Sequence, residues 1–268
     1  MFSRLALPKI AGIAAAALAT VTVSAAEQPT VTSEVPDSDL KELNDPTILS
    51  RRLWLETEWN KFRDHTNVVE ETLGAQWGWR VSDNQDWAVR LKLPMKFRFG
   101  GDDPTLTDIG GLGDIKIATG TAFRLSKTFR IGLGADLAMP TGREELSDNF
   151  WRIQEFGAIG WDITSWLTFS PSVEYNQSFA EEHGIGRAHF LEAFVPLTFI
   201  LPHKWAISVG YENKTDFEND NYVTHRAKLQ VSKELENIPL SFSLSAKRDF
   251  DSGEKQVQVN FVISYFFR

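Results

Sequence analysis

The sequence lacks cysteine entirely, and basic residues and long apolar runs are scarce in it. Without cysteine, its 268 residues exclude a disulfide scaffold and a zinc or iron–sulfur site with cysteine ligands. Lys and Arg number 28 against 36 Asp and Glu, which argues against nucleic-acid binding, because that favours a basic face. Beyond the N-terminus, no segment approaches the length of a membrane-spanning helix.

Catalytic and cofactor motifs are also missing. The chain contains no P-loop, no H-E-x-x-H pair and no G-x-S-x-G nucleophile turn. Five histidines occur without metal-ligand spacing. We therefore expect neither an enzyme nor a cofactor or metal site. An alternative, less favoured, is a membrane-embedded hydrolase that uses His225 and Ser243 on neighbouring strands.

The first 26 residues have the pattern of a signal peptide. Arg4 and Lys9 precede an apolar run from Ile10 to Val23, and Ser24-Ala25-Ala26 supplies small residues for cleavage. A single membrane helix is the rival interpretation, but the run is short and an acidic stretch follows. Removing Arg4 and Lys9 leaves 26 basic and 36 acidic residues, a net charge of −10. Residues 27–50 are polar and proline-containing, which predicts a flexible N-terminal periplasmic arm with a short helix possible near 39–43.

From residue 51 onward the pattern changes to an alternation of apolar and polar residues, which Phe156 and Phe194 break in the sixth and eighth segments. The clearest stretch is Gly110–Gly142, in which apolar and polar residues alternate along two arms joined by Ser126-Lys127-Thr128. Each arm has about a dozen residues, which is long for a soluble strand but suits a tilted transmembrane strand of about 9–11 residues. The stretch is therefore predicted to be a transmembrane β-hairpin.

Twelve such segments occur, and they predict an all-β fold: an antiparallel up-and-down transmembrane β-barrel over residues 51–268. The segments are 52–63, 68–80, 87–100, 113–125, 129–140, 150–161, 166–178, 187–200, 205–213, 222–233, 239–249 and 256–268. Their connections are mostly short after every second strand and longer after the others, which is typical of short periplasmic turns and longer extracellular loops. Ten or fourteen strands remain possible, and a secreted β-sandwich or soluble barrel is the alternative fold.

Tryptophan placement supports the membrane interpretation. Seven of the nine tryptophans fall at strand ends beside the N-terminus or a short turn, where an aromatic girdle would meet the periplasmic interface. They are Trp54, Trp77, Trp79, Trp87, Trp161, Trp166 and Trp205. In a soluble sandwich, tryptophans would more often lie mid-strand in the core.

The hairpin also carries a family resemblance. It begins at Gly110-Gly111-Leu112-Gly113-Asp114 and ends at Met139-Pro140-Thr141-Gly142, and in this it resembles the outer-membrane transporters grouped as the MetA-pathway-of-phenol-degradation family. The resemblance implies an exported outer-membrane barrel that moves small, often aromatic, molecules. It implies no catalytic residues.

If the apolar faces meet lipid, the alternate faces line a narrow lumen rich in charge. The candidate lumen-lining residues are Arg90, Lys92, Lys96, Arg98, Asp114, Lys116, Arg124, Arg130, Asp136, Arg226, Lys228 and Lys247. One interpretation is a cross-lumen network of ion pairs that compensates buried charge. The other is a selectivity lining, in which the four basic residues of 90–98 favour anionic solutes.

These patterns predict an outer-membrane protein of a Gram-negative-type envelope that acts as a passive, porin-like channel or transporter for small molecules. The basic lining favours anionic solutes, and the family resemblance implies aromatic ones. The alternative function is a structural or surface-interaction barrel with a plugged lumen. The expected partners are outer-membrane lipid, lipopolysaccharide and a small solute, with no nucleic acid. The sequence gives no oligomeric state.

Overall fold

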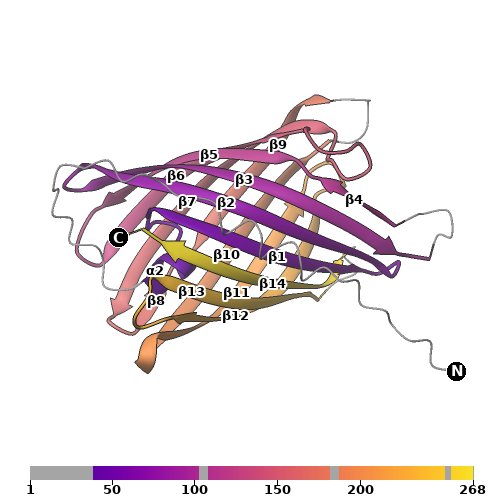
Figure 1. Ribbon diagram of the computed structural model, residues 1–268. Helices are drawn as coiled ribbons and strands as arrows, with labels where there is room; N and C mark the ends of the chain where they lie inside the picture. The colour runs from indigo at the N-terminus through magenta and orange to yellow at the C-terminus, as the bar shows by residue number, and fades with distance from the viewer. Residues whose placement is uncertain (1–38, 103–107, 182–186, 251–254, 268) are drawn as a thin grey trace, which may run out of the picture. The chain divides into compact units, whose positions relative to one another are not determined.

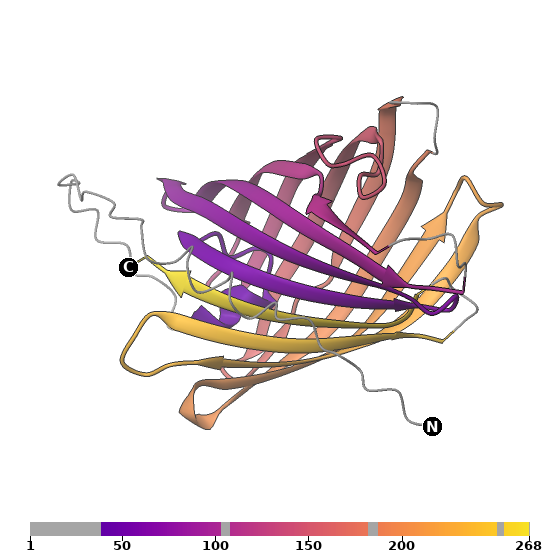
Figure 2. The ribbon, with the colours of Figure 1, turned by 45° about the vertical axis from the view of Figure 1, so that its right-hand side comes forward.

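The computed structural model describes residues 39–102, 108–181, 187–250 and 255–267, so the predicted signal peptide lies outside the described residues. All strands belong to one antiparallel sheet, in which the last strand pairs with the first and closes the ring. The fourteen strand segments occupy twelve strand positions around the barrel. β4 and β5 share one position, since both pair with β3, and β8 and β9 share another, since both lie between β7 and β10. The predicted twelve-stranded barrel is confirmed (Figures 1 and 2).

The strands lie close to their predicted positions. They are β1 (Arg52–Phe62), β2 (Thr66–Ser82), β3 (Gln85–Gly100), β4 (Ile109–Leu112), β5 (Ile115–Arg124), β6 (Phe129–Met139), β7 (Phe150–Thr164), β8 (Leu167–Phe169), β9 (Ser172–Glu181), β10 (His189–Leu201), β11 (Trp205–Asp216), β12 (Tyr222–Glu234), β13 (Leu240–Asp249) and β14 (Lys255–Phe266). A short helix α2 (Asp39–Asn44) precedes them, and a 3-10 turn η2 (Pro202–Lys204) joins β10 to β11.

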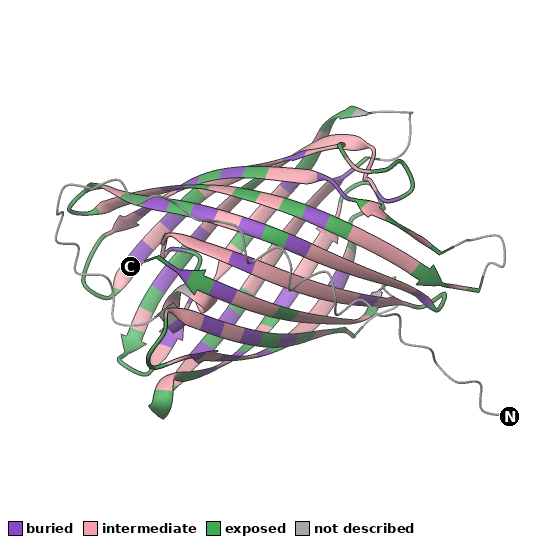
Figure 3. Ribbon diagram, viewed as in Figure 1, coloured by how far each residue is buried: buried purple, intermediate pink, exposed green. Residues whose placement is uncertain are grey.

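Burial alternates along the strands and defines the two faces of the wall (Figure 3). Val89, Leu91 and Leu93 of β3 are exposed, whereas Ala88 and Pro94 on the opposite face are buried. The exposed set includes a large apolar side chain from nearly every strand, and the buried set is rich in Thr, Ser, Asn, Gln and charged residues. A soluble barrel has the reverse pattern, so the outer surface is the one that a bilayer requires.

Two prolines explain why two of the transmembrane strands are each interrupted and divided into two segments. Pro94 in β3 has no N–H to donate to the neighbouring strand. That strand is interrupted opposite Pro94, between β4 and β5, where the Gly113 N–H donates to the Pro94 carbonyl at 2.9 Å. Pro196 in β10 likewise faces the interruption between β8 and β9. The second break also contains Pro171, whose carbonyl accepts from Ile159 N–H at 2.9 Å.

Most of the predicted tryptophan girdle lies on the outer face. Trp77, Trp79, Trp161, Trp166 and Trp205 are 39–53% exposed, and Trp87 pairs with Trp79 across β2 and β3. Trp54 is a correction, because it is only 5% exposed and packs inside the barrel over Gly74. Its place on the even-numbered face of β1, beside Arg52, puts it in the lumen. None of the described helices has the length and apolar character needed to cross a bilayer.

Candidate functional site: the barrel lumen

A short stretch before the first strand enters the barrel. We call residues 39–50 the lumenal segment; it is the C-terminal half of the predicted arm and begins with α2. Leu40, Asp45 and Thr47 are each only 1% exposed. The segment contacts widely separated strands of the ring: Ser170 between β8 and β9 donates to the Asn44 carbonyl, Gln230 of β12 donates to the Asn44 side chain at 2.9 Å, and Gln76 of β2 donates to the Ser50 carbonyl at 3.2 Å. It therefore crosses the lumen near the end where β1 begins.

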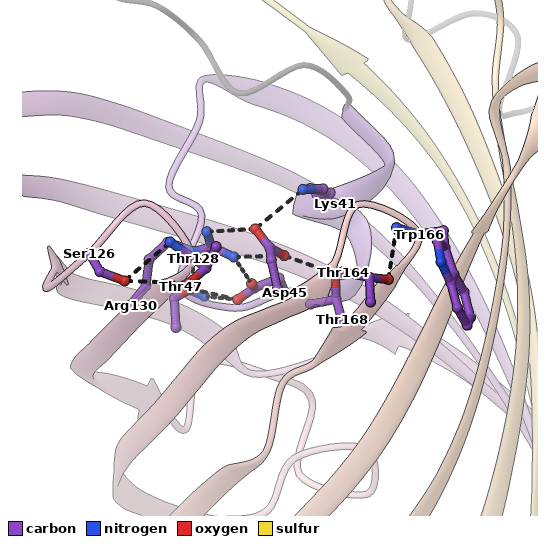
Figure 4. Close-up of polar contacts among 10 residues, drawn as sticks. Lys41, Asp45, Thr47, Ser126, Thr128, Arg130, Thr164, Trp166 and Thr168 are labelled. Atoms are coloured by element: carbon purple, nitrogen blue, oxygen red, sulfur yellow. Dashed lines mark hydrogen bonds and ion pairs between the residues drawn. The ribbon is translucent and has the colours of Figure 1, made fainter.

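Arg130 of β6 holds the lumenal segment to the wall (Figure 4). Its guanidinium pairs with Asp45 at 2.8 Å, donates to the Thr47 hydroxyl at 3.1 Å and pairs with Asp162 of β7 at 3.2 Å. Asp162 also pairs with Lys41 at 3.2 Å. Asp45 in turn accepts from the Thr47 backbone N–H and hydroxyl. Because the side chains of Arg130, Asp45 and Asp162 are at most 11% exposed, the pairs satisfy charges that would otherwise be costly inside the barrel.

Three glycines provide the space that the lumenal segment occupies. A Cβ at Gly160 would lie 2.4 Å from the Thr47 hydroxyl oxygen, and one at Gly78 would lie 2.3 Å from the Leu49 carbonyl oxygen. At Gly132 the nearest atom would be the Thr47 methyl carbon at 3.3 Å. The absence of a side chain at these wall positions thus allows backbone and wall to approach closely.

Above the lumenal segment lies a cavity of about 270 Å³. The segment itself, from Leu43 to Leu49, supplies part of its lining. Phe156 of β7 and Phe194 of β10 line it from the wall, with their rings over Gly134 and Gly210. These two phenylalanines interrupt the alternation of their strands because they point into the lumen, and the sequence pattern flagged no role for them.

Seven of the twelve candidate lining residues form ion pairs, mostly along the wall. Arg90 pairs with Asp136 at 2.9 Å, Lys96 with Glu70 at 3.8 Å, and Arg124 with Asp86. Arg226 and Lys247 both pair with Glu212, at 2.8 and 2.5 Å. Arg130 completes the set through the lumenal segment. The partners lie on neighbouring or next-neighbouring strands, so this network follows the wall and leaves the central cavity open.

The other five candidates lack an ion pair within 4 Å in the described part of the chain. Lys92 and Lys116 are paired directly across β3 and β5, and Lys228 is paired with Lys247 across β12 and β13. Arg98 donates to the Glu145 carbonyl at 3.4 Å. Like charges directly opposite one another destabilise a sheet, so these lysine pairs do not serve stability.

Asp114 organises a loop. It is 2% exposed, and its carboxylate accepts from Gly142 N–H at 3.1 Å and from the Ser147 hydroxyl and Asp148 N–H, both at 2.7 Å. These bonds fold the connection between β6 and β7 onto the break between β4 and β5. In the same loop, the exposed Glu145 carboxyl has a lowered pKa, because it accepts hydrogen bonds from the Glu145 backbone N–H and from the Arg143 guanidinium.

The residues of the hydrolase alternative do not meet. Ser243 is paired with Ser232 of β12, and His225 lies seven residues farther along that strand, a separation of roughly 20 Å. His225 is instead hydrogen-bonded to Tyr211. Within the described ranges, no group of three His, Cys, Asp or Glu side chains has a metal-binding arrangement.

The fold and its two faces are those of outer-membrane β-barrels, and solved structures share them. An outer membrane channel from Pseudomonas putida F1 superposes with a TM-score of 0.67 at 13% identity, covering 82% of this chain and 96% of that one. The CymD monoaromatic hydrocarbon channel gives 0.55 at 7% identity over 86% and 93%, and the KdgM porin gives 0.54 at 10% identity over 81% and 99%. No protein-family model and no curated protein sequence matches the chain.

Proposed function

We propose that the protein is a passive channel for small molecules in the outer membrane. The observation that carries this proposal is the closed wall itself, apolar outside and charged inside, around a cavity. The channel and porin names of its structural neighbours support it. Solutes would diffuse down their gradient, with outer-membrane lipid and lipopolysaccharide as the surroundings and the first 26 residues as the export signal.

We further propose that the twelve candidate residues line the pathway, and that Lys92 and Lys116 make it prefer anions. Two cations held side by side, with no carboxylate of the described residues within 4 Å, raise the local concentration of anions. The Gly-Asp and Pro-Thr-Gly ends of the central hairpin further support a relationship to the MetA-pathway-of-phenol-degradation family. In this chain the aspartate of the first motif, Asp114, anchors the loop before β7.

A second candidate is a structural barrel with a plugged lumen. The lumenal segment favours it, because Arg130, Asp45 and the three glycines hold that segment across the lumen. The two candidates differ in one measurable property, which is whether ions and solutes pass through the purified protein.

Planar-bilayer recording and liposome swelling decide between them. A channel gives discrete conductance steps and solute-dependent swelling, whereas a plugged barrel gives neither. In the channel case, replacing Lys92 and Lys116 with methionine should shift the reversal potential in a KCl gradient towards cation selectivity. Lys127→Met in the exposed turn between β5 and β6 is the matched control and should leave the reversal potential unchanged.

A further inference from the structure

The cavity above the lumenal segment has a mixed lining that suits a particular kind of ligand. Two phenylalanine rings form its apolar walls, and between their strands β7 and β10 the chain contributes the small side chains of Ser170 and Ser172. Because Gly134 and Gly210 receive the rings, each ring folds back against the wall, with atoms 2.4 and 2.5 Å from where a Cβ would stand. The space between them is thereby kept free.

Most hydrogen-bond donors around the cavity are already engaged. Arg90 donates to Asp136, Gln154 donates to Glu174 at 2.8 Å, and Gln230 donates to Asn44. Gln76 donates to the Ser50 carbonyl at 3.2 Å, and Arg52 lies over the Trp54 ring. A ligand would therefore compete with an existing contact at each of these side chains, except at the Arg90 Nε–H, which has no hydrogen-bond partner among the described residues.

Lys228 is different. Its ammonium lies 5.1 Å from the centre of the Phe194 ring, and it has no carboxylate within 4 Å among the described residues. An ammonium that stacks on an aromatic ring and forms no ion pair keeps hydrogen-bonding capacity for an incoming acceptor. It is also paired across the sheet with Lys247, whose own charge is offset by Glu212.

We propose that this cavity is a binding site for small organic monoanions, in which Lys228 receives a carboxylate and the rings of Phe156 and Phe194 contact an apolar body. This deepens the proposed function and rests on it. Glu174 also lines the cavity, so a second carboxylate on the ligand is repelled and dianions are disfavoured. The neutral amide of the same body loses the charge-assisted hydrogen bond.

Calorimetric titration of the folded barrel in detergent tests the site without requiring conductance. Cyclohexanecarboxylate is the probe, with cyclohexanecarboxamide and acetate as comparators that lack the charge and the apolar body. We expect the carboxylate to bind more tightly than both. Lys228→Met should weaken it about tenfold or more, since a charge-assisted hydrogen bond is lost. Lys228→Arg should restore binding, and Lys127→Met, which removes a cation from the exposed turn between β5 and β6, should leave it within about twofold.

A second variant separates the apolar contact from the charge. Phe194→Ala should weaken cyclohexanecarboxylate but leave acetate unchanged. Binding of carboxylate and carboxamide with equal affinity, or a Lys228→Met variant that binds as the parent protein does, overturns the site. If the site binds but bilayers show no conductance, the proposed channel fails and the site survives. If bilayers show conductance but the carboxylate does not bind, the binding site fails and the proposed channel survives.

Discussion

Replacing Gly160 with valine should expel the lumenal segment from the barrel. A Cβ at this position would stand 2.4 Å from the Thr47 hydroxyl oxygen and 2.5 Å from an Asp45 carboxylate oxygen, closer than real contacts allow. Gly160 lies on a strand, so the wall cannot yield as readily as the segment. Moving Asp45 breaks its 2.8 Å ion pair with Arg130, whose side chains are 1% and 11% exposed. Breaking such a pair destabilises the bound state of the lumenal segment by about 3 kcal/mol or more. The fraction of molecules in which the segment has dissociated from the wall therefore rises roughly a hundredfold.

The absence of native cysteine gives a direct assay. Leu40→Cys places one thiol on α2 at a position that is 1% exposed. In the parent background this thiol should react slowly with a maleimide, because the reagent reaches it only when the lumenal segment dissociates from the inner wall of the barrel. Adding Gly160→Val should accelerate labelling by up to about a hundredfold and increase single-channel conductance. Heat-modifiable migration on a denaturing gel checks that each variant still forms the barrel.

Gly157→Val is the matched control on the same strand. Its Cβ would point outward and meet only Leu133 and Val173, at 3.6 and 3.8 Å, which are ordinary contacts. Labelling and conductance should stay at the parent values. If Gly160→Val labels no faster than Gly157→Val while the barrel remains folded, the close packing described for Thr47 and Asp45 does not hold the segment, and the reasoning is refuted.

Two further predictions concern the wall and its outer loop. Asp114→Ala removes the acceptor of three hydrogen bonds, so limited proteolysis should cleave the loop between β6 and β7 faster, whereas Glu145→Ala in the same loop should not; equal cleavage would deny Asp114 its anchoring role. Glu212→Gln leaves Arg226 and Lys247 without their shared carboxylate and should destabilise the barrel by about 2–3 kcal/mol in urea unfolding. Glu58→Gln, whose carboxylate accepts from Asn60 alone among the hydrogen bonds described, should cost less, and a similar loss in both would argue against the ion pairs.

The alternation of side chains was readable from the sequence because it is a local property. Successive residues of a strand point to opposite faces, and a bilayer requires one face to be apolar over its whole thickness. Hence the twelve strands and the outward direction of Leu91 or Leu133 followed from the order of residues alone. Turn and loop lengths are local as well, so the order of strands around the ring could also be predicted.

What fills the barrel could not be read in this way, because it depends on which residues meet after closure. Arg130 and Asp45 are 85 positions apart, and Gln230 and Asn44 are 186 apart. The sequence marked residues 27–50 as polar and flexible, and it placed Trp54 in the outer girdle. Only the closed ring shows glycines on β2, β6 and β7 converging on the lumenal segment.

The same distinction applies to the charges and the two phenylalanines. Composition and face determined that Arg90, Lys92 and Lys228 belong to one side of the wall. The tertiary structure decided that Arg90 pairs with Asp136 two strands away, while Lys228 lines the cavity with the Phe194 ring 5.1 Å from its ammonium and no ion pair within the described residues. A ring that breaks the alternation, such as Phe156, acquires meaning only when Gly134 is found beneath it. Local pattern therefore fixed the wall, and long-range closure determined its contents.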